Sequence, residues 1–252
     1  MKLEAVNISF SYAEKKIIDD CSISLEPGKM TVITGPNGSG KTTLLHLLGG
    51  LLKPVSGTVA ADGRELEKFS DIQRACTIGV LGQEKAPALD FYVYDRIMMG
   101  RFARLPRLFA PGRNDLDAVE HAMKLMGISS FAETPCNRIS GGEYQKVLIA
   151  ALLARQTPVM LLDEPTSALD PAGALAVMRI LKKCSAEASV AVVTHDLSLA
   201  AAFADELVIV DHGKIFSAGT PEQILTGETI HAVYGCDSEI ITSSRGPVVV
   251  FR

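Results

Sequence analysis

Short apolar runs recur along the chain and alternate with segments whose apolar residues repeat at helical spacing. Residues 2–10 and 17–25 alternate between apolar and polar side chains, which predicts two strands, and Pro27-Gly28 predicts a turn after the second. Further short strands are expected at residues 30–34, 58–61, 77–81, 159–162, 190–194 and 207–210, with a helix at 42–52. Because strands that alternate with helices pair in parallel, the pattern predicts an α/β fold with a mainly parallel sheet.

The middle of the chain departs from this alternation. Between residues 93 and 156 the spacing is helical, most clearly at 93–101, 115–126 and 142–154. We therefore expect a single domain, residues 1–252, in which a helical subdomain (93–156) is inserted into a core made of residues 1–92 and 157–252. After Gly213 we expect two short strands and small helices, ending in an apolar segment at 248–251.

Charge and cysteine content narrow the classes of function. The 252 residues include 25 Lys+Arg and 29 Asp+Glu, and a net charge of -4 gives no general reason to bind nucleic acid or an anionic membrane. A local basic patch and a solvated loop are equally consistent with the clustered Arg101, Arg104, Arg107 and Arg113. The five scattered cysteines include no C-x-x-C pair, which argues against a disulfide framework or zinc site and indicates a reducing compartment.

No apolar stretch approaches the ~18 residues that a membrane-spanning helix needs. If the protein acts on a membrane, we expect a partner to span it.

The strongest chemical motif is the segment that follows the expected strand at 30–34. Residues 35–42 read G-P-N-G-S-G-K-T and match the phosphate-binding pattern G-x-x-x-x-G-K-[ST], with a strand before it and a helix after it. Gly38 and Gly40 allow positive φ and let backbone N–H groups approach phosphate. We expect Lys41 to reach the β- and γ-phosphates and Thr42 to hold Mg²⁺. A glycine-rich turn before a structural helix explains the full match far less well.

Two further segments carry charge or anion-binding geometry. Asp163 and Glu164 end an apolar strand, where Asp163 can bind Mg²⁺ and Glu164 can orient or deprotonate the attacking water. The segment Ser140-Gly141-Gly142 opens a helix, which is again an anion-binding geometry. Because one triphosphate does not need two such sites, the second is expected to serve the ATP of another copy; an ordinary helix start with Ser140 as N-cap remains the alternative.

With these motifs in this order, the chain resembles the ATP-binding cassette (ABC) ATPases over nearly all its length. The resemblance implies a P-loop NTPase core with an N-terminal antiparallel β subdomain. It implies that Tyr12 stacks on adenine, that Gln83 touches Mg²⁺, and that Asp170 belongs to a loop at a dimer interface. The implied catalytic residues are Glu164, His195, Lys41 and Gln83. The implied metal ligands are Thr42, Gln83 and Asp163. The other implied nucleotide contacts are Gly35, Pro36, Asn37, Gly38, Ser39, Gly40, Thr43, Ser140, Gly141, Gly142 and Glu143.

The resemblance also implies a cycle in which two copies close head to tail on two ATP molecules, so that hydrolysis opens the homodimer. The chain departs from the family pattern at three positions. Ile139 replaces the commoner Leu before Ser140, Ala151 stands where an Arg is usual, and Gly82 precedes Gln83 where a Pro is common.

Softer similarities concern the subfamily. Residues 93–95, 99–101, 219–221, 225–226 and 233–235, with Pro106, are similar to cassettes that energise uptake of iron–siderophore complexes, haem and vitamin B12. Such importers place two ATPase copies on the cytoplasmic face of the inner membrane, with two permease subunits and an external binding protein. The segments could instead only pack the helical subdomain and the tail. A soluble ABC ATPase, such as an iron–sulfur assembly factor, and an exporter ATPase remain alternatives. The sequence does not identify the transported molecule.

Overall fold

The computed structural model covers residues 1–252 and describes all of them except 83–90, 106–109 and 244–245. Its strands are β1 (Leu3–Tyr12), β2 (Lys15–Leu25), β3 (Met30–Thr34), β4 (Ser56–Ala61), β5 (Arg64–Glu65), β6 (Ile78–Leu81), β7 (Val159–Asp163), β8 (Ser189–Val193), β9 (Glu206–Asp211), β10 (Lys214–Gly219), β11 (Ser238–Ser243) and β12 (Gly246–Phe251). Its α-helices are α1 (Lys41–Leu48), α2 (Asp71–Thr77), α3 (Val93–Met98), α4 (Arg113–Met126), α5 (Gly141–Ala154), α6 (Pro171–Cys184), α7 (Leu197–Phe203), α8 (Pro221–Ile224) and α9 (Gly227–Tyr234). Short 3₁₀ turns are η1 (Leu66–Lys68), η2 (Met99–Arg101), η3 (Ser129–Phe131) and η4 (Cys136–Arg138).

Two sheets form the centre of the molecule. Among the described residues, the larger sheet has the strand order β10-β9-β3-β8-β7-β6, and every neighbouring pair is parallel except β9 with β10. The smaller sheet, β2-β1-β4-β5, is antiparallel. The expected α/β class, with a mainly parallel sheet and an antiparallel N-terminal β part, is confirmed.

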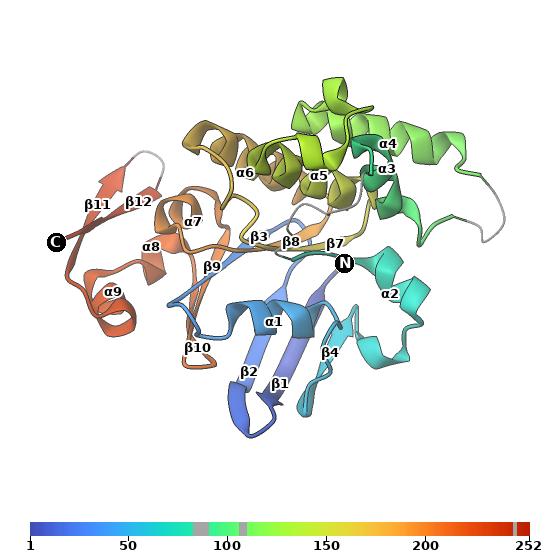
Figure 1. The fold of residues 1–252 in the computed structure, drawn as a ribbon. Coiled ribbons are helices and arrows are strands. Elements are labelled where there is room, and N and C mark those ends of the chain that lie inside the picture. The colour runs from blue at the N-terminus through green and yellow to red at the C-terminus, as the bar shows by residue number, and fades with distance from the viewer. Residues whose placement is uncertain (83–90, 106–109, 244–245) are drawn as a thin grey trace.

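Side-chain alternation on the central strands divides the interior into two cores. Met30 and Val32 of β3 enter one core with the side chains of α5, α6 and α7, whereas Ile33 enters the other with α1 and the antiparallel sheet. Figure 1 shows the corresponding layers, with α3 to α6 on one side of the central sheet and α1 with β1, β2 and β4 on the other. Because both faces are covered, the parallel strands are continuous apolar runs, as the sequence pattern indicated.

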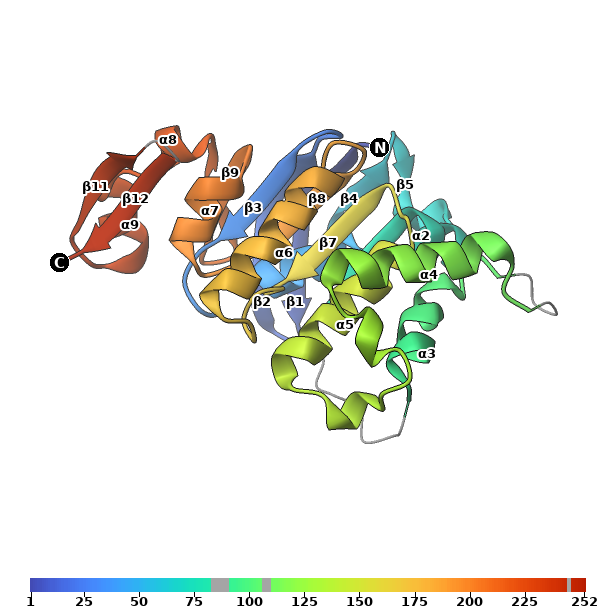
Figure 2. The same cartoon turned by 90° about the horizontal axis from the view of Figure 1, so that it is seen from above.

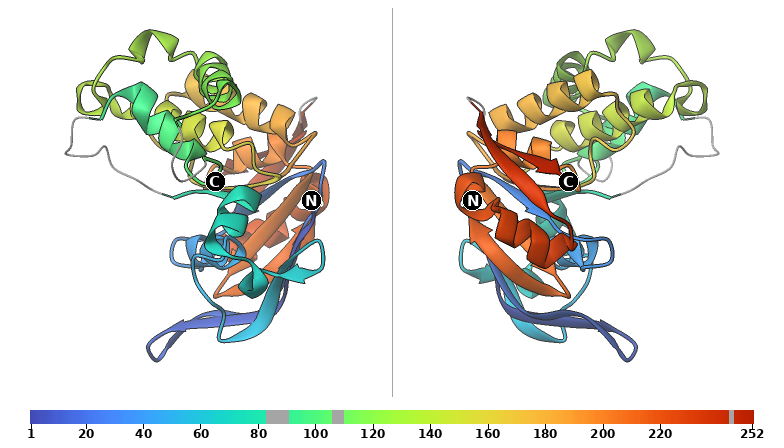
Figure 3. Two further views of the ribbon diagram at one scale, coloured as in Figure 1. Left: turned by 90° about the vertical axis from the view of Figure 1, so that its right-hand side faces the viewer. Right: turned by 90° about the vertical axis from the view of Figure 1, so that its left-hand side faces the viewer.

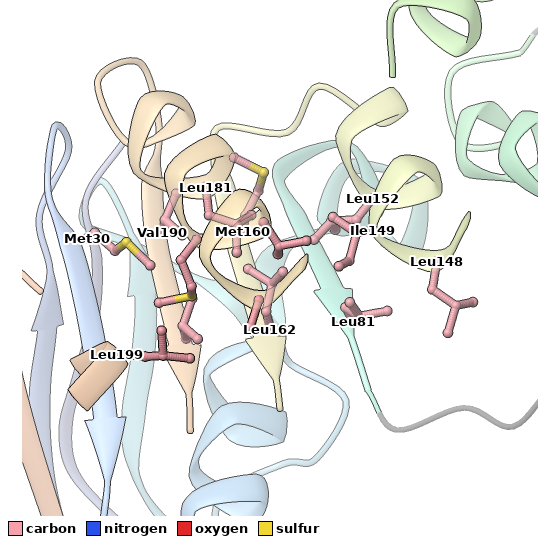
Figure 4. Packing of buried hydrophobic residues seen from close by; sticks show 14 of the residues in the cluster. Met30, Leu81, Leu148, Ile149, Leu152, Met160, Leu162, Leu181, Val190 and Leu199 are labelled. Atoms are coloured by element: carbon pink, nitrogen blue, oxygen red, sulfur yellow. The ribbon is translucent and has the colours of Figure 1, made fainter. Parts of the chain in front are cut away.

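The core between the sheet and the helical layer is densely apolar. In Figure 4 the strand residues Met160, Leu162 and Val190 face Leu181 of α6 and Ile149 of α5. The described chain between β6 and β7 forms helices and turns, except for a bridge between Tyr92 and Pro135. Figure 3 shows this helical part projecting on the opposite side of the sheet from the β1–β2 hairpin.

Two of the clustered arginines, the buried Arg101 and the exposed Arg104, bind backbone carbonyls at the end of α5. Arg101 is 5% exposed and donates to the Asp115 carboxylate (2.8 Å) and the Ala154 carbonyl (2.8 Å). Arg104 donates to the carbonyls of Arg155 and Gln156, each at 2.8 Å. The two side chains therefore cap the carbonyl end of α5, and for Arg101 neither a basic patch nor a solvated loop is correct. Arg107 lies outside the described residues.

The chain after Gly213 differs from expectation by one strand. The structure has β10, β11 and β12 there, where the sequence pattern predicted two strands. The β11–β12 hairpin pairs only with itself, so its alternation is weakly constrained by burial. In the part of the chain that the structure describes, no helix combines the length and apolar character needed to cross a membrane.

Candidate functional site

The loop between β3 and α1 is shaped by glycines that no other residue can replace without movement. Gly35 has φ 146° and Gly40 has φ 105°. A Cβ on Gly35 would lie 2.0 Å from the Val210 carbonyl oxygen, and one on Gly40 would lie 2.9 Å from Ile18 Cδ1. The backbone conformation and the close approach of β9 and β2 therefore both require glycine. We call residues 35–42 the phosphate-binding loop.

Helix α1 starts without a side-chain cap. Its N-cap residue is Gly40, whereas Ser140, Asp170 and Asp196 cap α5, α6 and α7 with side-chain oxygens. The first N–H groups of a helix have no partner within the helix and carry a partial positive charge. The N-terminus of α1 is therefore free to bind an anion, and the loop brings it to the carboxyl edge of the parallel strands.

Lys41 is held inside the phosphate-binding loop. Its Nζ donates to the carbonyls of Gly35 (2.9 Å) and Pro36 (2.7 Å), and the residue is 8% exposed. Burial lowers the pKa of Lys41, and the negative charges of Glu164 and Asp163 oppose that shift. A triphosphate would supply the counter-charge that this buried ammonium lacks.

Thr42 and Asp163 bring two oxygen-bearing side chains together. The Thr42 hydroxyl donates to Asp163 Oδ2 at 2.7 Å, and Asp163 is 2% exposed at the end of β7. Asp163 Oδ1 is buried without a hydrogen-bond partner among the described residues. Hydroxyl and carboxylate oxygens are the donors that Mg²⁺ prefers, so these residues fit that cation. No group of three His, Cys, Asp or Glu in the described chain is placed to hold a metal, so further ligands would come from nucleotide or water.

Glu164 occupies a strained position directly after β7. Its φ is 49°, in the left-handed region, and its N–H donates to the Val193 carbonyl at 3.0 Å. Such a conformation costs about 1 kcal/mol or more in a residue other than glycine, and it concentrates at functional sites. Glu164 Oε1 lies 2.9 Å from Nδ1 of the exposed His195. Oε2 is buried and has no partner in the described part of the chain, so this oxygen is available to a water or substrate.

A cavity of ≈ 280 Å³ opens beside the loop. Tyr12, Lys15 and Ile17 of the small sheet line it together with Gly38, Gly40, Lys41, Thr42 and Thr43. The Tyr12 ring is half exposed and meets Phe10 edge-on, with the ring centroids 4.9 Å apart. An exposed aromatic face next to a phosphate-binding loop is suited to stack on a base. Lys15 and Ile17 were not predicted; the hairpin that pairs Tyr12 with Lys15 places them at the same mouth.

The remaining loop residues differ in exposure. Pro36 is half-buried, Asn37 and Gly38 are exposed, and Ser39 is buried. Ser39 Oγ has no hydrogen-bond partner among the residues described, while its carbonyl accepts from the Gly213 N–H at 3.0 Å. A buried hydroxyl without a partner is costly, so the Ser39 side chain is a further group that a ligand could satisfy.

The segment at the start of α5 contacts other parts of the chain. Ser140 and Glu143 form a capping box: the Glu143 N–H donates to Ser140 Oγ at 3.3 Å, and the Ser140 N–H donates to the Glu143 carboxylate at 2.7 Å. The Ser140 hydroxyl also donates to that carboxylate at 2.7 Å. A Cβ on Gly142 would lie 3.1 Å from the Ala168 carbonyl, and Gly141 opens the helix beside it. Within the described residues, neither Ser140 nor Glu143 hydrogen-bonds to the phosphate-binding loop. One chain therefore keeps this segment next to the loop that follows Glu164.

Two other predicted residues have different outcomes. Asp170 is exposed and caps α6, since its Oδ1 accepts from the Gly173 N–H at 2.7 Å. This contact belongs to the helix start and does not join Asp170 to the phosphate-binding loop of its own chain. Gln83 lies outside the described residues, so its role stays a prediction.

An enzyme that binds a triphosphate between β3 and α1 and acts on it from the end of β7 is a P-loop nucleoside triphosphatase. The fold and the site place the chain in that class. Residues 18–167 match the family model described as ABC transporter, and the chain belongs to that family, as an ATP-binding and ATP-hydrolysing component.

Curated relatives cover most of the chain. The hemin import ATP-binding protein HmuV of Rhodococcus jostii is 37% identical over 242 residues, 95% of this chain and 82% of the relative. The ferric enterobactin transport ATP-binding protein FepC of Escherichia coli is 33% identical over 242 residues, 95% and 89% respectively. The cobalamin import ATP-binding protein BtuD of Halobacterium salinarum is 35% identical over 236 residues, which span 93% of this chain but 59% of that relative.

Solved structures share the fold over almost the whole chain. An inward-facing ABC transporter, described as of the metal-chelate type, matches with a TM-score of 0.83 and 25% identity, covering 99% of this chain and 96% of that one. The dimeric ABC transporter cassette MJ0796 matches with a TM-score of 0.78 and 27% identity, covering 87% and 98%.

Proposed function

We propose that this chain is the ATPase subunit of an importer for iron chelates, haem or a cobalamin-type molecule. The observation that carries the ATPase part is a pair of buried oxygens, Asp163 Oδ1 and Glu164 Oε2, at the strand end near Lys41. Neither oxygen has a hydrogen-bond partner among the described residues. The importer part is supported by the relatives that import hemin and cobalamin and transport ferric enterobactin.

The proposed nucleotide site assigns one role to each group. The adenine stacks on Tyr12, the phosphates lie on the N–H groups of residues 35–43, and Lys41 leaves its carbonyl partners to meet the β- and γ-phosphates. Thr42 and Asp163 would hold Mg²⁺, which, when bound, neutralises charge on the phosphates. Gln83 is proposed as a further ligand of the Mg²⁺ ion.

Hydrolysis requires a water to be placed in line with the γ-phosphate. Glu164 Oε2, which has no partner in the described part of the chain, can accept a proton from this water or orient it, while Oε1 stays with His195. The hydrogen bond to His195 fixes the rotamer of the carboxylate, and the exposed imidazole can reach the γ-phosphate. Lys41 stabilises the charge on the transferred phosphoryl group, so the residues act by positioning and electrostatics.

The active form is proposed to be a homodimer with shared sites. In each chain the segment Ser140–Glu143 lies next to residues 165–170 and not at its own phosphate-binding loop. A head-to-tail partner would bring that N-terminus, capped by Ser140, to the other face of the nucleotide. Residues 93–156 are accordingly the helical subdomain that carries this segment, between core parts 1–92 and 157–252.

The same proposal places the dimer at the cytoplasmic face of the inner membrane. Two membrane permease subunits would span the bilayer and receive cargo from an external binding protein, a proposal supported by the likeness to ATP-binding proteins of import systems. Substrate contacts would then belong to those partners, and ATP would supply the driving force from this side.

The catalytic assignment can be tested with Glu164→Gln. The amide keeps the size of the side chain but cannot take a proton, so ATP binding should persist while turnover falls at least about 100-fold. The variant should run as an ATP-dependent dimer on size-exclusion chromatography. Glu187→Gln, at an exposed site after α6, is the matched control. Full turnover by Glu164→Gln would remove Glu164 as the base.

The transport assignment can be tested by growth. A strain lacking this gene should lose growth on a haem, ferric-siderophore or cobalamin source, and the wild-type gene, but not Glu164→Gln, should restore it. Recovery of no polytopic membrane protein with the tagged chain from detergent-solubilised membranes would contradict a transporter.

A further inference from the structure

The C-terminal tail, residues 220–252, lies at one end of the molecule beyond β9 and α7, as Figure 2 shows. It contains α8, α9 and the β11–β12 hairpin, and none of its residues has a role in the site proposed above. Helix α9 is firmly docked: Thr226 caps its start, Gly235 (φ 69°) ends it, and Ile230 and Val233 are buried in the larger core.

The last residue of α9 reaches the strand end that leads into the phosphate-binding loop. Tyr234 Oη lies 3.2 Å from Oγ1 of Thr34, the final residue of β3, which is fully buried. Burial raises the pKa of Tyr234, and hydrogen bonds from Thr34 and from the Gly35 backbone oppose that rise. The hydroxyl therefore contacts the last residue of β3, directly before the phosphate-binding loop and 200 residues away in sequence.

The Thr34–Gly35 step opens the phosphate-binding loop and contacts Lys41 in this structure. The Gly35 carbonyl accepts from Lys41 Nζ at 2.9 Å. On its other side Gly35 is so close to Val210 that a Cβ would lie 2.0 Å from that residue's carbonyl oxygen. A small shift of this backbone step would thus move the carbonyl that holds the lysine, and nothing on the β9 side leaves room to absorb it.

We propose that Tyr234 is a positioning residue for ATP: its hydroxyl fixes the Thr34–Gly35 step, so the C-terminal tail helps to hold the phosphate-binding loop in its binding conformation. The proposal rests on the assignment of residues 35–42 as the triphosphate site. A hydroxyl taken out of water costs free energy unless it is hydrogen-bonded, and here its partner is Thr34, directly before the loop.

A second contact joins the same tail to the other half of the site. Strand β12 packs against α7, and a Cβ on Gly246 would lie 3.0 Å from the Ala201 carbonyl of that helix. Helix α7 begins directly after His195 and its cap Asp196. The tail therefore braces both the loop that binds phosphate and the helix behind the histidine that pairs with Glu164.

The test separates positioning from simple docking of the tail. Tyr234→Phe removes only the hydroxyl, and loss of one hydrogen bond predicts an about 3- to 10-fold rise in KM for ATP. Because the lost interaction acts on the bound substrate and transition state alike, kcat should change by less than about 2-fold. Binding of a fluorescent ATP analogue should weaken by the same factor as the KM rises.

Thr34→Val removes the other side of the same contact. It should raise KM similarly, and Tyr234→Phe with Thr34→Val should be no worse than the stronger single variant, because both delete one interaction. Tyr94→Phe, a partly buried tyrosine on α3, is the matched control and should leave KM unchanged. Thermal unfolding of each variant without nucleotide gives the purely structural effect.

The outcomes are distinct. A lowered unfolding temperature in Tyr234→Phe with unchanged KM, or fully additive effects of the two variants, would overturn the positioning role. If the wild type binds the analogue and Lys41→Ala does not, the loop assignment stands, and an unchanged KM in Tyr234→Phe then overturns the Tyr234 proposal alone. If the wild type bound no analogue, the loop assignment would fail first and the inference with it.

Discussion

At Gly35 the backbone passes so close to β9 that the absence of a side chain is a structural requirement. The carbonyl oxygen of Val210 occupies the space where a Cβ would stand, and φ is 146°. Gly28, in the turn after β2, also has positive φ (80°) but has open space around it. A comparison of substitutions at the two glycines therefore separates the free-energy cost of the backbone conformation from that of the steric clash.

Gly35→Ala should lower the free energy of unfolding by about 3 kcal/mol or more, because conformational strain and overpacking add. Gly28→Ala should cost only about 1 kcal/mol, the conformational part alone. Urea unfolding of both variants, followed by circular dichroism, measures the difference. Equal losses would show that β9 yields to the new methyl group.

Sequence motifs predicted the residues that touch phosphate better than those that support them. The pattern at 35–42 indicated the loop, because its glycines and Lys41 act locally and at fixed spacing. Lys15 and Tyr234 were not predicted, since their roles depend on a hairpin register and on a contact between distant segments. The N-cap that Asp170 forms on α6 depends only on neighbouring residues and could have been predicted. The family resemblance instead implied a role for Asp170 at a dimer interface.

Among the elements, α5 shows how one helix end is completed by another segment. The last carbonyls of a helix have no partner within it. Arg101 and Arg104, from the turn η2 and the residues after it, donate to the carbonyls of residues 154–156. Arg101 also forms a buried ion pair with Asp115 of α4, so one guanidinium joins three elements.

Arg101→Met should destabilise the protein by about 3 kcal/mol, because it removes the buried cation from the largely buried Asp115 carboxylate. That carboxylate would keep only the Gly112 N–H as a donor among its described partners. Arg104→Met removes two hydrogen bonds at an exposed site and should cost about 1 kcal/mol. Thermal and urea unfolding of the two variants are the measurements. If Arg104→Met lowered the free energy of unfolding as much as Arg101→Met, burial would not be the reason that Arg101 matters more.

Element types were largely predictable, and ends less so. The strand at 30–34 has the predicted bounds because its apolar run is bounded by Lys29 and Gly35. Helix α1 ends at Leu48 and not at residue 52, since Gly49 caps it and Gly50 (φ 66°) turns the chain away. The third strand after Gly213 was missed because β11 and β12 pair only with each other, so neither is part of the alternation of strands and helices in the central sheet.

At the scale of the whole molecule, the central sheet separates two cores that carry different halves of the proposed chemistry. Helix α1 and the small sheet supply the phosphate-binding loop and Tyr12 on one side. The helical layer presents Ser140 on the other, away from its own loop. The two cores could be predicted from apolar runs on parallel strands. Their relative placement could not, because it depends on packing across the sheet.

A shared-site dimer makes two inactive variants complement each other. Lys41→Ala destroys the phosphate-binding loop of a chain, and Ser140→Arg destroys its contribution to the partner's nucleotide. In a mixed dimer one site receives both defects and the other receives neither. An equal mixture should therefore recover about a quarter of the wild-type ATPase rate if sites act independently. Activity no higher than the sum of the separate variants would contradict independent shared sites.

One hydrogen bond described by the structure, from Gln145 Nε2 to the Pro165 carbonyl (3.1 Å), joins the helix that starts at Ser140 to the segment just after Glu164. In the proposed dimer, Ser140 contacts the ATP of the partner chain, whereas Glu164 acts on the ATP of its own chain. The hydrogen bond of each chain would then connect the two ATP sites. Release of phosphate from the site that Ser140 contacts would displace the Glu164 carboxylate at the other site. We therefore expect hydrolysis of one ATP to change the rate of hydrolysis of the other. In a single-turnover experiment, the time course of ATP hydrolysis should then not fit a single exponential.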